Sequence, residues 1–232
     1  MEKKYNQVKN YIMSLIEEQK VARGEKIPSE RELSEALGLS RMTIRQGIEL
    51  LVNEGILKKE LGRGTFFATP HYQQKNIRSF TETLRAQGHT PSTIVLESAI
   101  VFRLAEISQI MGVPLETRFY KIKRLRLGND MPIALETVYI PEKLCPDLAG
   151  KNLSDSLYAI LKEDYNYVVD RSALSIDAII SNTPLNTIFR VDKPTALLKI
   201  ISTHFTKDYQ KIYYEEAYYR SDLYTYYVDI YR

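Results

Sequence analysis

The segment PSERELSEALGLSRMTIRQGIELL, residues 28–51, places two short amphipathic patterns on either side of a tight turn. Ser29 and Glu32 have the spacing of a capping box, so the first helix is expected to begin there, and Gly38 is expected to end it. Ser40 is the expected N-cap of the second helix. Two short helices joined by a tight glycine-containing turn are a helix-turn-helix.

A basic hairpin is expected after the second helix, in the stretch ILKKELGRGTFFA at residues 56–68. Residues 56–57 and 65–67 are the predicted strands, and Gly62, Arg63 and Gly64 form the tip between them. Residues 4–19 are expected to form an earlier helix because apolar residues recur there at helical spacing. A helix-turn-helix followed by a basic hairpin predicts a winged helix.

Long polar side chains lie opposite the apolar stripe of the second helix. Arg45 and Gln46 point away from that stripe, and Arg41 and Thr43 flank them near the helix start. Side chains at the start of a recognition helix reach base edges, where arginine suits guanine and glutamine suits adenine. A simpler interpretation is a surface ion pair between Arg45 and Glu49. The preceding turn and the following hairpin favour DNA binding.

Phosphate contacts are expected around the same helix. Ser40 and Thr43, together with the free amides of the helix N-terminus, suit phosphate oxygens. Lys58 and Lys59 add positive charge, and Arg63 at the hairpin tip can enter a minor groove or touch the DNA backbone. These residues extend the predicted DNA contact from the helix to the wing.

Over residues 5–69 the sequence resembles the winged helix of the GntR superfamily of bacterial transcription regulators, through PSERELSEALGLSRMTIRQGIELLVNEGILKKELGRGTFF. The resemblance implies that Arg31, at the start of the first helix of the motif, contacts phosphate. It also implies DNA contacts by Arg41, Thr43, Arg45 and the wing from Gly62 to Gly64. Gly47 stands where the family usually has alanine, at a packing position that should not alter the reading of DNA.

The remaining chain is expected to form a second, mixed domain. Residues 69–76 are polar and without periodicity, so the predicted division is 1–69, a linker at 70–76, and 77–232. Helices are predicted at 79–87, 105–111, 154–164 (opened by Ser154) and near 184–190. Strands are predicted at 93–103, 117–127, 133–140, 168–180, 196–206, 212–220 and 224–231. Consecutive hairpins predict an α+β domain on a mainly antiparallel sheet.

An anion site is predicted in this second domain. Ser79 caps the helix that begins at Phe80 and Thr81, and the amides at a helix start favour an anion, although plain capping is the more common explanation of this pattern by itself. Arg124 and Arg126 share one face of a strand. Either Glu136 on the next strand is their partner, or all three form a clamp for a polar, anionic ligand.

Residues 77–232 resemble the UTRA effector-binding domain of the HutC branch of the same superfamily. The resemblance rests on S-F-T-E, R-L-R, A-L-E, Y-I-P, S-L-Y and Y-Y-R-S-D. It implies a fold related to chorismate lyase and, as in members that sense sugar phosphates, ligand contacts by Phe80, Thr81, Arg124, Arg126, Glu136, Ser156 and Tyr219. Such members often carry a glutamate six residues before this tyrosine. Here Tyr213 occupies that position, and Glu215 is the candidate substitute.

Charge and cysteine content limit which partners and which cellular compartment fit this sequence. Residues 1–69 carry 12 basic and 10 acidic side chains and the chain has a net charge of +3, so positive charge for DNA must be placed locally. Cys145 is the single cysteine, which excludes an intramolecular disulfide and favours a reducing compartment. No run approaches the ~20 apolar residues that span a bilayer. We expect a soluble, cytoplasmic protein.

The 17 tyrosines are concentrated near the C-terminus, nine of them in residues 209–231. Core packing and a dimer interface are equally consistent with this cluster. The three histidines are far apart in sequence and near no cysteine set, so no metal site is expected.

The combined prediction is a homodimeric transcription regulator, most simply a repressor of carbohydrate-utilisation genes, on a palindromic operator. A phosphorylated sugar is the predicted effector, and no catalysis and no cofactor are expected. Three alternatives stay open: an amino-acid or other carboxylate effector, a chorismate-lyase-type enzyme fused to a DNA-binding module, and a nucleoid-type binder without sequence specificity.

Overall fold

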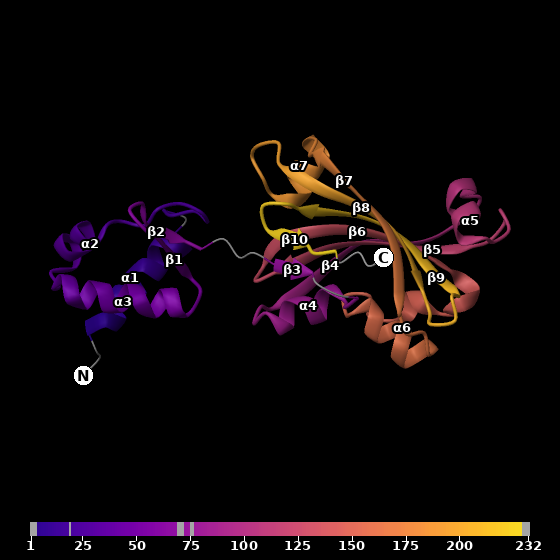
Figure 1. The fold of residues 1–232 in the computed structure, drawn as a ribbon, viewed down its shortest axis with the longest axis horizontal. Helices are drawn as coiled ribbons and strands as arrows, with labels where there is room; N and C mark the ends of the chain where they lie inside the picture. The colour runs from indigo at the N-terminus through magenta and orange to yellow at the C-terminus, as the bar shows by residue number, and fades with distance from the viewer. Residues whose placement is uncertain (1–3, 19, 69–71, 75–76, 229–232) are drawn as a thin grey trace. The chain divides into compact units, whose positions relative to one another are not determined.

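The computed structural model describes residues 4–18, 20–68, 72–74 and 77–228. Internal contacts divide the chain into two compact units, with the division between residues 70 and 71 (Figure 1).

The first unit contains three helices and a hairpin: α1 (Lys4–Glu17), α2 (Glu30–Leu37), α3 (Arg41–Asn53), β1 (Leu57–Glu60) and β2 (Gly64–Phe67). Ser29 caps α2 with Glu32 in a complete capping box, and Gly38 ends the helix in the left-handed conformation at φ 64°. Ser40 caps α3 through the Thr43 amide. These elements confirm the predicted winged helix.

The core of the first unit forms where α1 lies against α3. Ile44, Ile48 and Leu51 of α3 are buried with Val8 and Ile12 of α1, and together they fix which side of α3 faces outward. At Gly47 the two helices approach so closely that an added Cβ would lie 2.5 Å from Val8 Cβ. The glycine in place of the family's alanine therefore follows from this helix contact.

The second unit is built on a six-stranded antiparallel sheet in the order β4-β5-β6-β9-β8-β7. Its strands are β4 (Pro91–Val101), β5 (Phe119–Gly128), β6 (Met131–Pro141), β7 (Arg171–Ile180), β8 (Ala196–Phe205) and β9 (Lys211–Arg220). The predicted α+β architecture with a mainly antiparallel sheet is confirmed.

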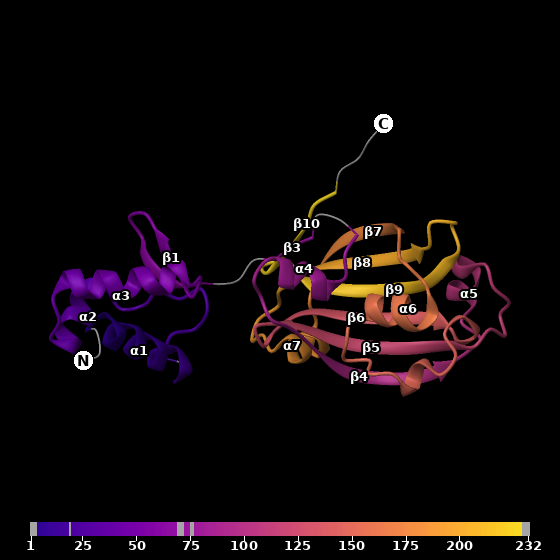
Figure 2. The same cartoon turned by 90° about the horizontal axis from the view of Figure 1, so that it is seen from below.

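Helices cover both faces of this sheet. Helix α6 (Leu157–Tyr165) lies over one face, where it packs on Ile122 and Val138, and Figure 2 shows it across the strands. Helix α4 (Phe80–Ala86) packs on the same face through Leu84. Helices α5 (Ala105–Met111) and α7 (Thr183–Phe189) pack on the opposite face. Two short 3₁₀ turns, Glu142–Leu144 and Leu148–Gly150, follow β6.

A small parallel sheet joins distant parts of the chain. Strand β3 (Tyr72–Gln74) pairs with β10 (Tyr224–Tyr226). Irregular structure was expected across 70–76, and Tyr72–Gln74 depart from it because backbone pairing with β10 and burial of the Tyr72 ring hold them. Residues 69–71 and 75–76 of the predicted linker lie outside the described residues.

Several predicted elements have different bounds in the structure, most of them by one to three residues. The strand expected at 224–231 ends at Tyr226, and residues 229–231 lie outside the described part; residue 19 of the first helix does too. Helix α6 begins at Leu157 with Ser156 as its N-cap, not at Ser154. The Asn152 side chain and backbone oxygens accept the amides of Ser154 and Asp155, which holds these residues in a turn.

Candidate functional site

The outward side of α3 carries the side chains predicted to reach DNA bases. Arg41, Arg45 and Gln46 are exposed, whereas Thr43 is half-buried. Thr43 Oγ1 lies 2.9 Å from Ser40 Oγ, which also accepts the Thr43 amide at 3.3 Å. The N-terminal turn of α3 is thus capped and rigid, with its polar groups at the surface.

Most cations of this surface are held by neighbouring carboxylates. Arg45 donates to Glu30 at 2.9 Å, not to Glu49, which pairs with Lys59 at 3.6 Å. The Arg45 hydrogen bond, with its charge, holds the pKa of the Glu30 carboxyl below its ordinary value. The remaining pairs are Arg31–Glu35, Lys58–Glu60 and Arg63–Glu60. Exposed pairs of this kind are weak, so a DNA phosphate can replace each carboxylate.

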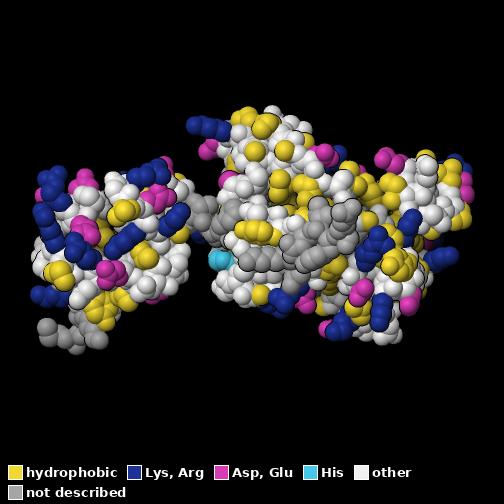
Figure 3. Space-filling model, viewed as in Figure 1, with side chains coloured by type: hydrophobic (Ala, Val, Ile, Leu, Met, Phe, Trp, Pro, Cys, Tyr) yellow, Lys and Arg dark blue, Asp and Glu magenta, His cyan; other side chains and the backbone are white. Residues whose placement is uncertain are grey.

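Arg41 differs from these residues, since it forms no ion pair within the described parts of the chain. Figure 3 shows Lys and Arg side chains spread over the visible face of the first unit with acidic side chains between them. In the wing, Gly64 has φ 123°, so a residue with a side chain would be strained there, and the end of the Lys26 side chain would have to move.

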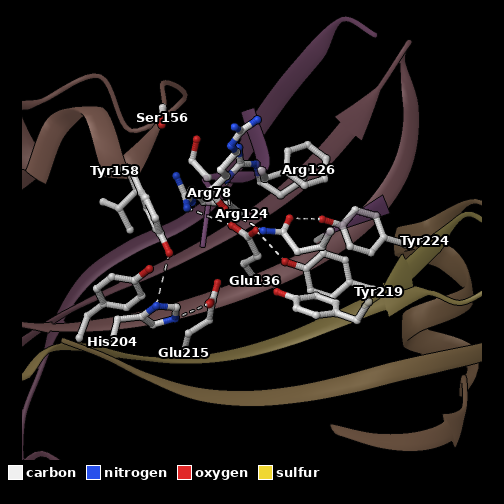
Figure 4. A pocket seen from close by; sticks show the side chains of 16 residues that line it. Arg78, Arg124, Arg126, Glu136, Ser156, Tyr158, His204, Glu215, Tyr219 and Tyr224 are labelled. Atoms are coloured by element: carbon white, nitrogen blue, oxygen red, sulfur yellow. Dashed lines mark hydrogen bonds and ion pairs between the residues drawn. The ribbon is translucent and has the colours of Figure 1, made fainter. Parts of the chain in front are cut away.

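The second unit contains a polar hollow between the sheet, α4, α6 and β10, with about 460 Å³ of empty space that is partly open to solvent. Eight of the nine predicted effector residues line it: Ser79, Phe80, Arg124, Arg126, Glu136, Ser156, Glu215 and Tyr219. Thr81 lines a neighbouring hollow instead. Figure 4 shows side chains from several elements converging on one space.

Arg124, Arg126 and Glu136 form a buried cluster at the centre of the hollow. Each of the three is 3% exposed, and Glu136 Oε2 accepts from Arg124 Nη2 and Arg126 Nη1, both at 3.0 Å. Burial alone raises the pKa of the Glu136 carboxyl, but the charges of Arg126 and Arg124 outweigh it and hold that pKa below its usual value. Burial, followed by the charge of Arg126, lowers the pKa of Arg124.

The cluster of Arg124, Arg126 and Glu136 carries a net charge of +1. Two guanidinium groups face one carboxylate, and the Nε atoms of Arg124 and Arg126 are buried without a hydrogen-bond partner. Such orphaned donors are uncommon in protein interiors and call for an acceptor. Of the two interpretations, the Glu136 partnership is present in the structure, and the clamp for an anionic ligand stays a prediction.

Helix α4 contacts Arg126 through two of its side chains. Arg126 Nη2 donates to Thr81 Oγ1 at 3.1 Å, and its guanidinium lies 4.6 Å from the centre of the Phe80 ring. The Ser79 hydroxyl and amide are used in a capping box with Glu82. Plain capping therefore accounts for Ser79, while Phe80 and Thr81 position Arg126.

Four strands contribute to one row of polar side chains across the sheet. Arg124 on β5 is followed by Glu136 on β6, Glu215 on β9 and His204 on β8. The Tyr219 hydroxyl donates to Glu136 Oε1 at 3.4 Å. At the α6 end of the hollow, the Ser156 side chain accepts the Ala159 amide as N-cap.

Several lining residues were not predicted from the sequence. Gln74 and Arg78 lie in or next to the expected linker, and Tyr158, His204 and Tyr224 come from elements distant in the chain. Arg78 is exposed at the hollow (Figure 4). Nothing in the local pattern around His204 indicates a site, since its place follows only from the pairing of β8 with β7 and β9.

The described residues contain no group of three or more His, Cys, Asp and Glu side chains placed to hold a metal ion. Burial raises the pKa of the Cys145 thiol to about 12, so this cysteine is a poor nucleophile at neutral pH. No described helix is both long and apolar enough for a membrane span.

Comparison with solved structures supports the fold. PhnF from Mycobacterium smegmatis superposes with a TM-score of 0.70 at 22% identity, over 97% of this chain and 99% of that one. YydK from Bacillus subtilis, described as a possible transcriptional regulator, superposes with a TM-score of 0.58 at 21% identity over 97% of this chain and 99% of that one.

Sequence relatives cover nearly the whole chain. The transcriptional repressor NagR of Bacillus subtilis is 30% identical over 96% of this chain and 92% of its own length. The mannosyl-D-glycerate transport/metabolism system repressor MngR of Escherichia coli is 25% identical over 95% of this chain and 92% of its own length. Residues 4–67 match the gntR family of bacterial regulatory proteins, and residues 86–225 match the UTRA domain. The chain therefore belongs to the gntR family of bacterial regulatory proteins, as a winged-helix regulator with a UTRA domain.

Proposed function

We propose that this protein is a transcriptional repressor that binds a palindromic operator as a homodimer and changes its operator affinity when a phosphorylated sugar enters the second unit. In this proposal α3 enters the major groove, the wing contacts the DNA backbone, and the ligand's phosphate lies against Arg124 and Arg126. The effector and the operator then alter each other's affinity by the same factor, equivalent to about 1–3 kcal/mol.

The DNA part of the proposal is supported by the surface of α3. Its exposed arginines sit on a helix whose opposite side is fully buried, so the helix presents them in one orientation. Arg31 and Arg45 pair with solvent-accessible carboxylates, which compete only weakly with phosphate. NagR and MngR are both repressors, which supports repression over activation here.

The effector part rests on one observation above the others: the buried excess of positive charge at Arg124 and Arg126. Two guanidinium groups in a nearly dry site, with one carboxylate and two unsatisfied Nε donors, are more stable when an anion joins them. Phosphate offers several acceptor oxygens to such a pair. The polar lining of tyrosine, serine and carboxylate side chains suits the hydroxyl groups of a sugar.

A carboxylate effector is the alternative within the same function, because paired arginines bind carboxylate as well. The relative MngR is a repressor of a mannosyl-D-glycerate system, and glycerate is a carboxylate. An enzyme of chorismate-lyase type is disfavoured for two reasons. Both carboxylate oxygens of the buried Glu136 already accept hydrogen bonds, which leaves them poorly placed for acid–base catalysis, and the relatives are regulators.

Thermal stability in the presence of ligands tests the effector. A compound that binds only the folded state raises the unfolding temperature. The expected result is a rise with a hexose 6-phosphate that is lost in Arg126→Gln and kept in Arg118→Gln. Arg118 is an exposed arginine of the same unit that pairs with Glu142, so it controls for general charge. A rise only with carboxylates such as glycerate would replace the sugar phosphate by the alternative effector.

A further inference from the structure

Glu215 lies on the same face of the sheet as Glu136, one strand away. Strands β6 and β9 pair Glu136 with Ala217 and Val138 with Glu215, so the two carboxylates are offset by two residues along the sheet. Their side chains differ in exposure, 4% for Glu136 and 14% for Glu215. Glu215 is therefore the carboxylate that opens further into the hollow.

The two carboxylates also differ in their remaining hydrogen-bond capacity. Glu136 accepts from both arginines on Oε2 and from Tyr219 on Oε1. Glu215 uses only Oε2, which lies 3.1 Å from His204 Nε2 and accepts from Ser202 Oγ at 3.3 Å. Within the described residues no donor reaches Glu215 Oε1. This oxygen is an acceptor that a ligand can use.

His204 fixes the direction of Glu215. Its Nδ1 lies 2.8 Å from Ser172 Oγ and its Nε2 lies 2.8 Å from Ser202 Oγ, so both ring nitrogens are held (Figure 4 shows the ring beside Glu215). The Tyr213 ring stacks on the imidazole at a centroid distance of 4.1 Å. The tyrosine that replaces the glutamate of similar regulators thus supports the ring that orients Glu215.

We propose that Glu215 determines which effector the hollow accepts, by requiring a ligand with one anionic group for the arginines and a hydrogen-bond donor, hydroxyl or ammonium, for Oε1. This inference rests on the proposed function and deepens it. A ligand with a second anionic group meets the Glu215 carboxylate, and like charges in a poorly solvated site repel. The hollow therefore accepts a sugar monophosphate and rejects a sugar bisphosphate.

Replacing Glu215 by glutamine changes the group that faces the ligand from a hydrogen-bond acceptor to a donor. The carbonyl oxygen of the glutamine takes the place of Oε2, because Ser202 donates there, and the amide NH₂ then faces the hollow. Glutamine presents a donor in place of an acceptor, without charge. Glu216→Gln is the matched control, since Glu216 lies next along β9 and faces the opposite side of the sheet.

Calorimetric titration of the full chain with four probes tests the inference: glucose 6-phosphate, glucosamine 6-phosphate, glucose 1,6-bisphosphate and inorganic phosphate. Wild type and Glu216→Gln should bind at least one monophosphate about tenfold more tightly than the bisphosphate. Glu215→Gln should bind that monophosphate about tenfold more weakly, so that the ratio of monophosphate to bisphosphate affinity falls or inverts. Its affinity for inorganic phosphate should stay nearly unchanged. A larger loss for glucosamine 6-phosphate than for glucose 6-phosphate identifies the donor as ammonium, and equal losses identify it as hydroxyl.

The remaining outcomes contradict the inference. An unchanged monophosphate-to-bisphosphate ratio in Glu215→Gln overturns it while the proposed function stands. An equal loss for all four probes, inorganic phosphate included, assigns Glu215 a structural role only and overturns it too. If wild type binds none of the probes, the sugar-phosphate function falls, and the selectivity of Glu215 falls with it.

Discussion

Gln74 accepts a 2.8 Å hydrogen bond from the Tyr224 hydroxyl, which joins the strand that follows the winged helix to a strand near the C-terminus. The same Gln74 oxygen accepts from Thr83 of α4 at 2.8 Å, and both Gln74 and Tyr224 line the polar hollow. The chain segment that leaves the first unit is therefore part of the wall around the candidate effector site. We therefore expect a ligand that displaces this wall to alter the backbone pairing of Tyr72–Gln74 with β10.

Tyr224→Phe should weaken the connection between effector and operator. The substitution removes one buried hydrogen bond and leaves a Gln74 acceptor less well satisfied, at a cost of about 1–2 kcal/mol to stability. Effector binding should persist, while the factor by which the effector changes operator affinity falls. Operator titrations with and without glucose 6-phosphate measure this factor. Tyr218→Phe, on the opposite face of β9, should leave it unchanged, and equal factors in both variants would refute the role of Tyr224.

Glu136→Gln should destabilise the second unit at neutral pH. It leaves two buried guanidinium groups facing each other, and removing one partner of a buried ion pair costs about 3–5 kcal/mol. Tyrosine fluorescence during thermal unfolding reports this unit, because all but Tyr5 and Tyr11 of the 17 tyrosines lie in it. Glu97→Gln, which alters a more exposed pair with Lys121, should change stability much less.

The Glu136 cluster should also set the response to acid. The folded-state pKa of Glu136 is lowered from its ordinary value of 4.5, so its contribution to stability is fully present above that value. It is lost as pH falls further, through the folded-state pKa. Unfolding temperatures measured from pH 7 to pH 3 should therefore converge for wild type and Glu136→Gln only below about pH 4.5. A constant difference down to pH 3 would contradict this assignment.

Local patterns sufficed to predict the elements whose signals lie within a few residues. The capping boxes at Ser29 and Ser79 and the left-handed Gly38 occur where the sequence indicates them. Arg124 and Arg126 share a face because strand periodicity is two. The sequence also predicts the pairing of Glu136 with these arginines as one of two interpretations, since β5 and β6 form a hairpin.

The features that were missed depend on contacts between distant segments. Strand β3 is three residues long and polar at Gln73 and Gln74, so only its pairing with β10, about 150 residues later, makes it a strand. Arg45 pairs with Glu30, 15 residues earlier on α2, while Glu49 pairs with Lys59 of β1, and neither contact between elements is encoded in the spacing along α3. His204 enters the hollow through strand order, which local periodicity does not encode.

Gly47→Ala should destabilise the winged helix although alanine favours helices by about 1 kcal/mol over glycine. Its Cβ would overlap Val8 of α1, and overpacking of this kind costs about 1–3 kcal/mol. Hydrogen exchange in α1 and α3 should show faster opening. Gln46→Ala, exposed on the same helix, should stay within about 0.5 kcal/mol of wild type. Equal exchange rates in Gly47→Ala and wild type would refute the close helix contact.

Arg45→Ala and Lys58→Ala should weaken DNA binding in different ways. Loss of a base contact by Arg45 should reduce affinity for the preferred operator by roughly tenfold to a hundredfold and relax the preference at particular base pairs. Loss of a phosphate contact by Lys58 should weaken binding to all DNA sequences alike. It should also reduce the slope of log affinity against log salt concentration by about one. Binding measured against single-base operator variants at several salt concentrations separates the two. A uniform loss for Arg45→Ala would favour a non-specific DNA binder.

We infer that an anion held by Arg124 and Arg126 controls operator binding by the first unit. Operator affinity of the full chain, on a palindrome recovered by selection from random DNA, should be measured with and without a saturating sugar monophosphate. The expected result is a shift in operator affinity of about five- to 150-fold in wild type that disappears in Arg126→Gln and persists in Arg118→Gln. The same affinity with and without every sugar phosphate, or a shift that survives Arg126→Gln, would contradict it.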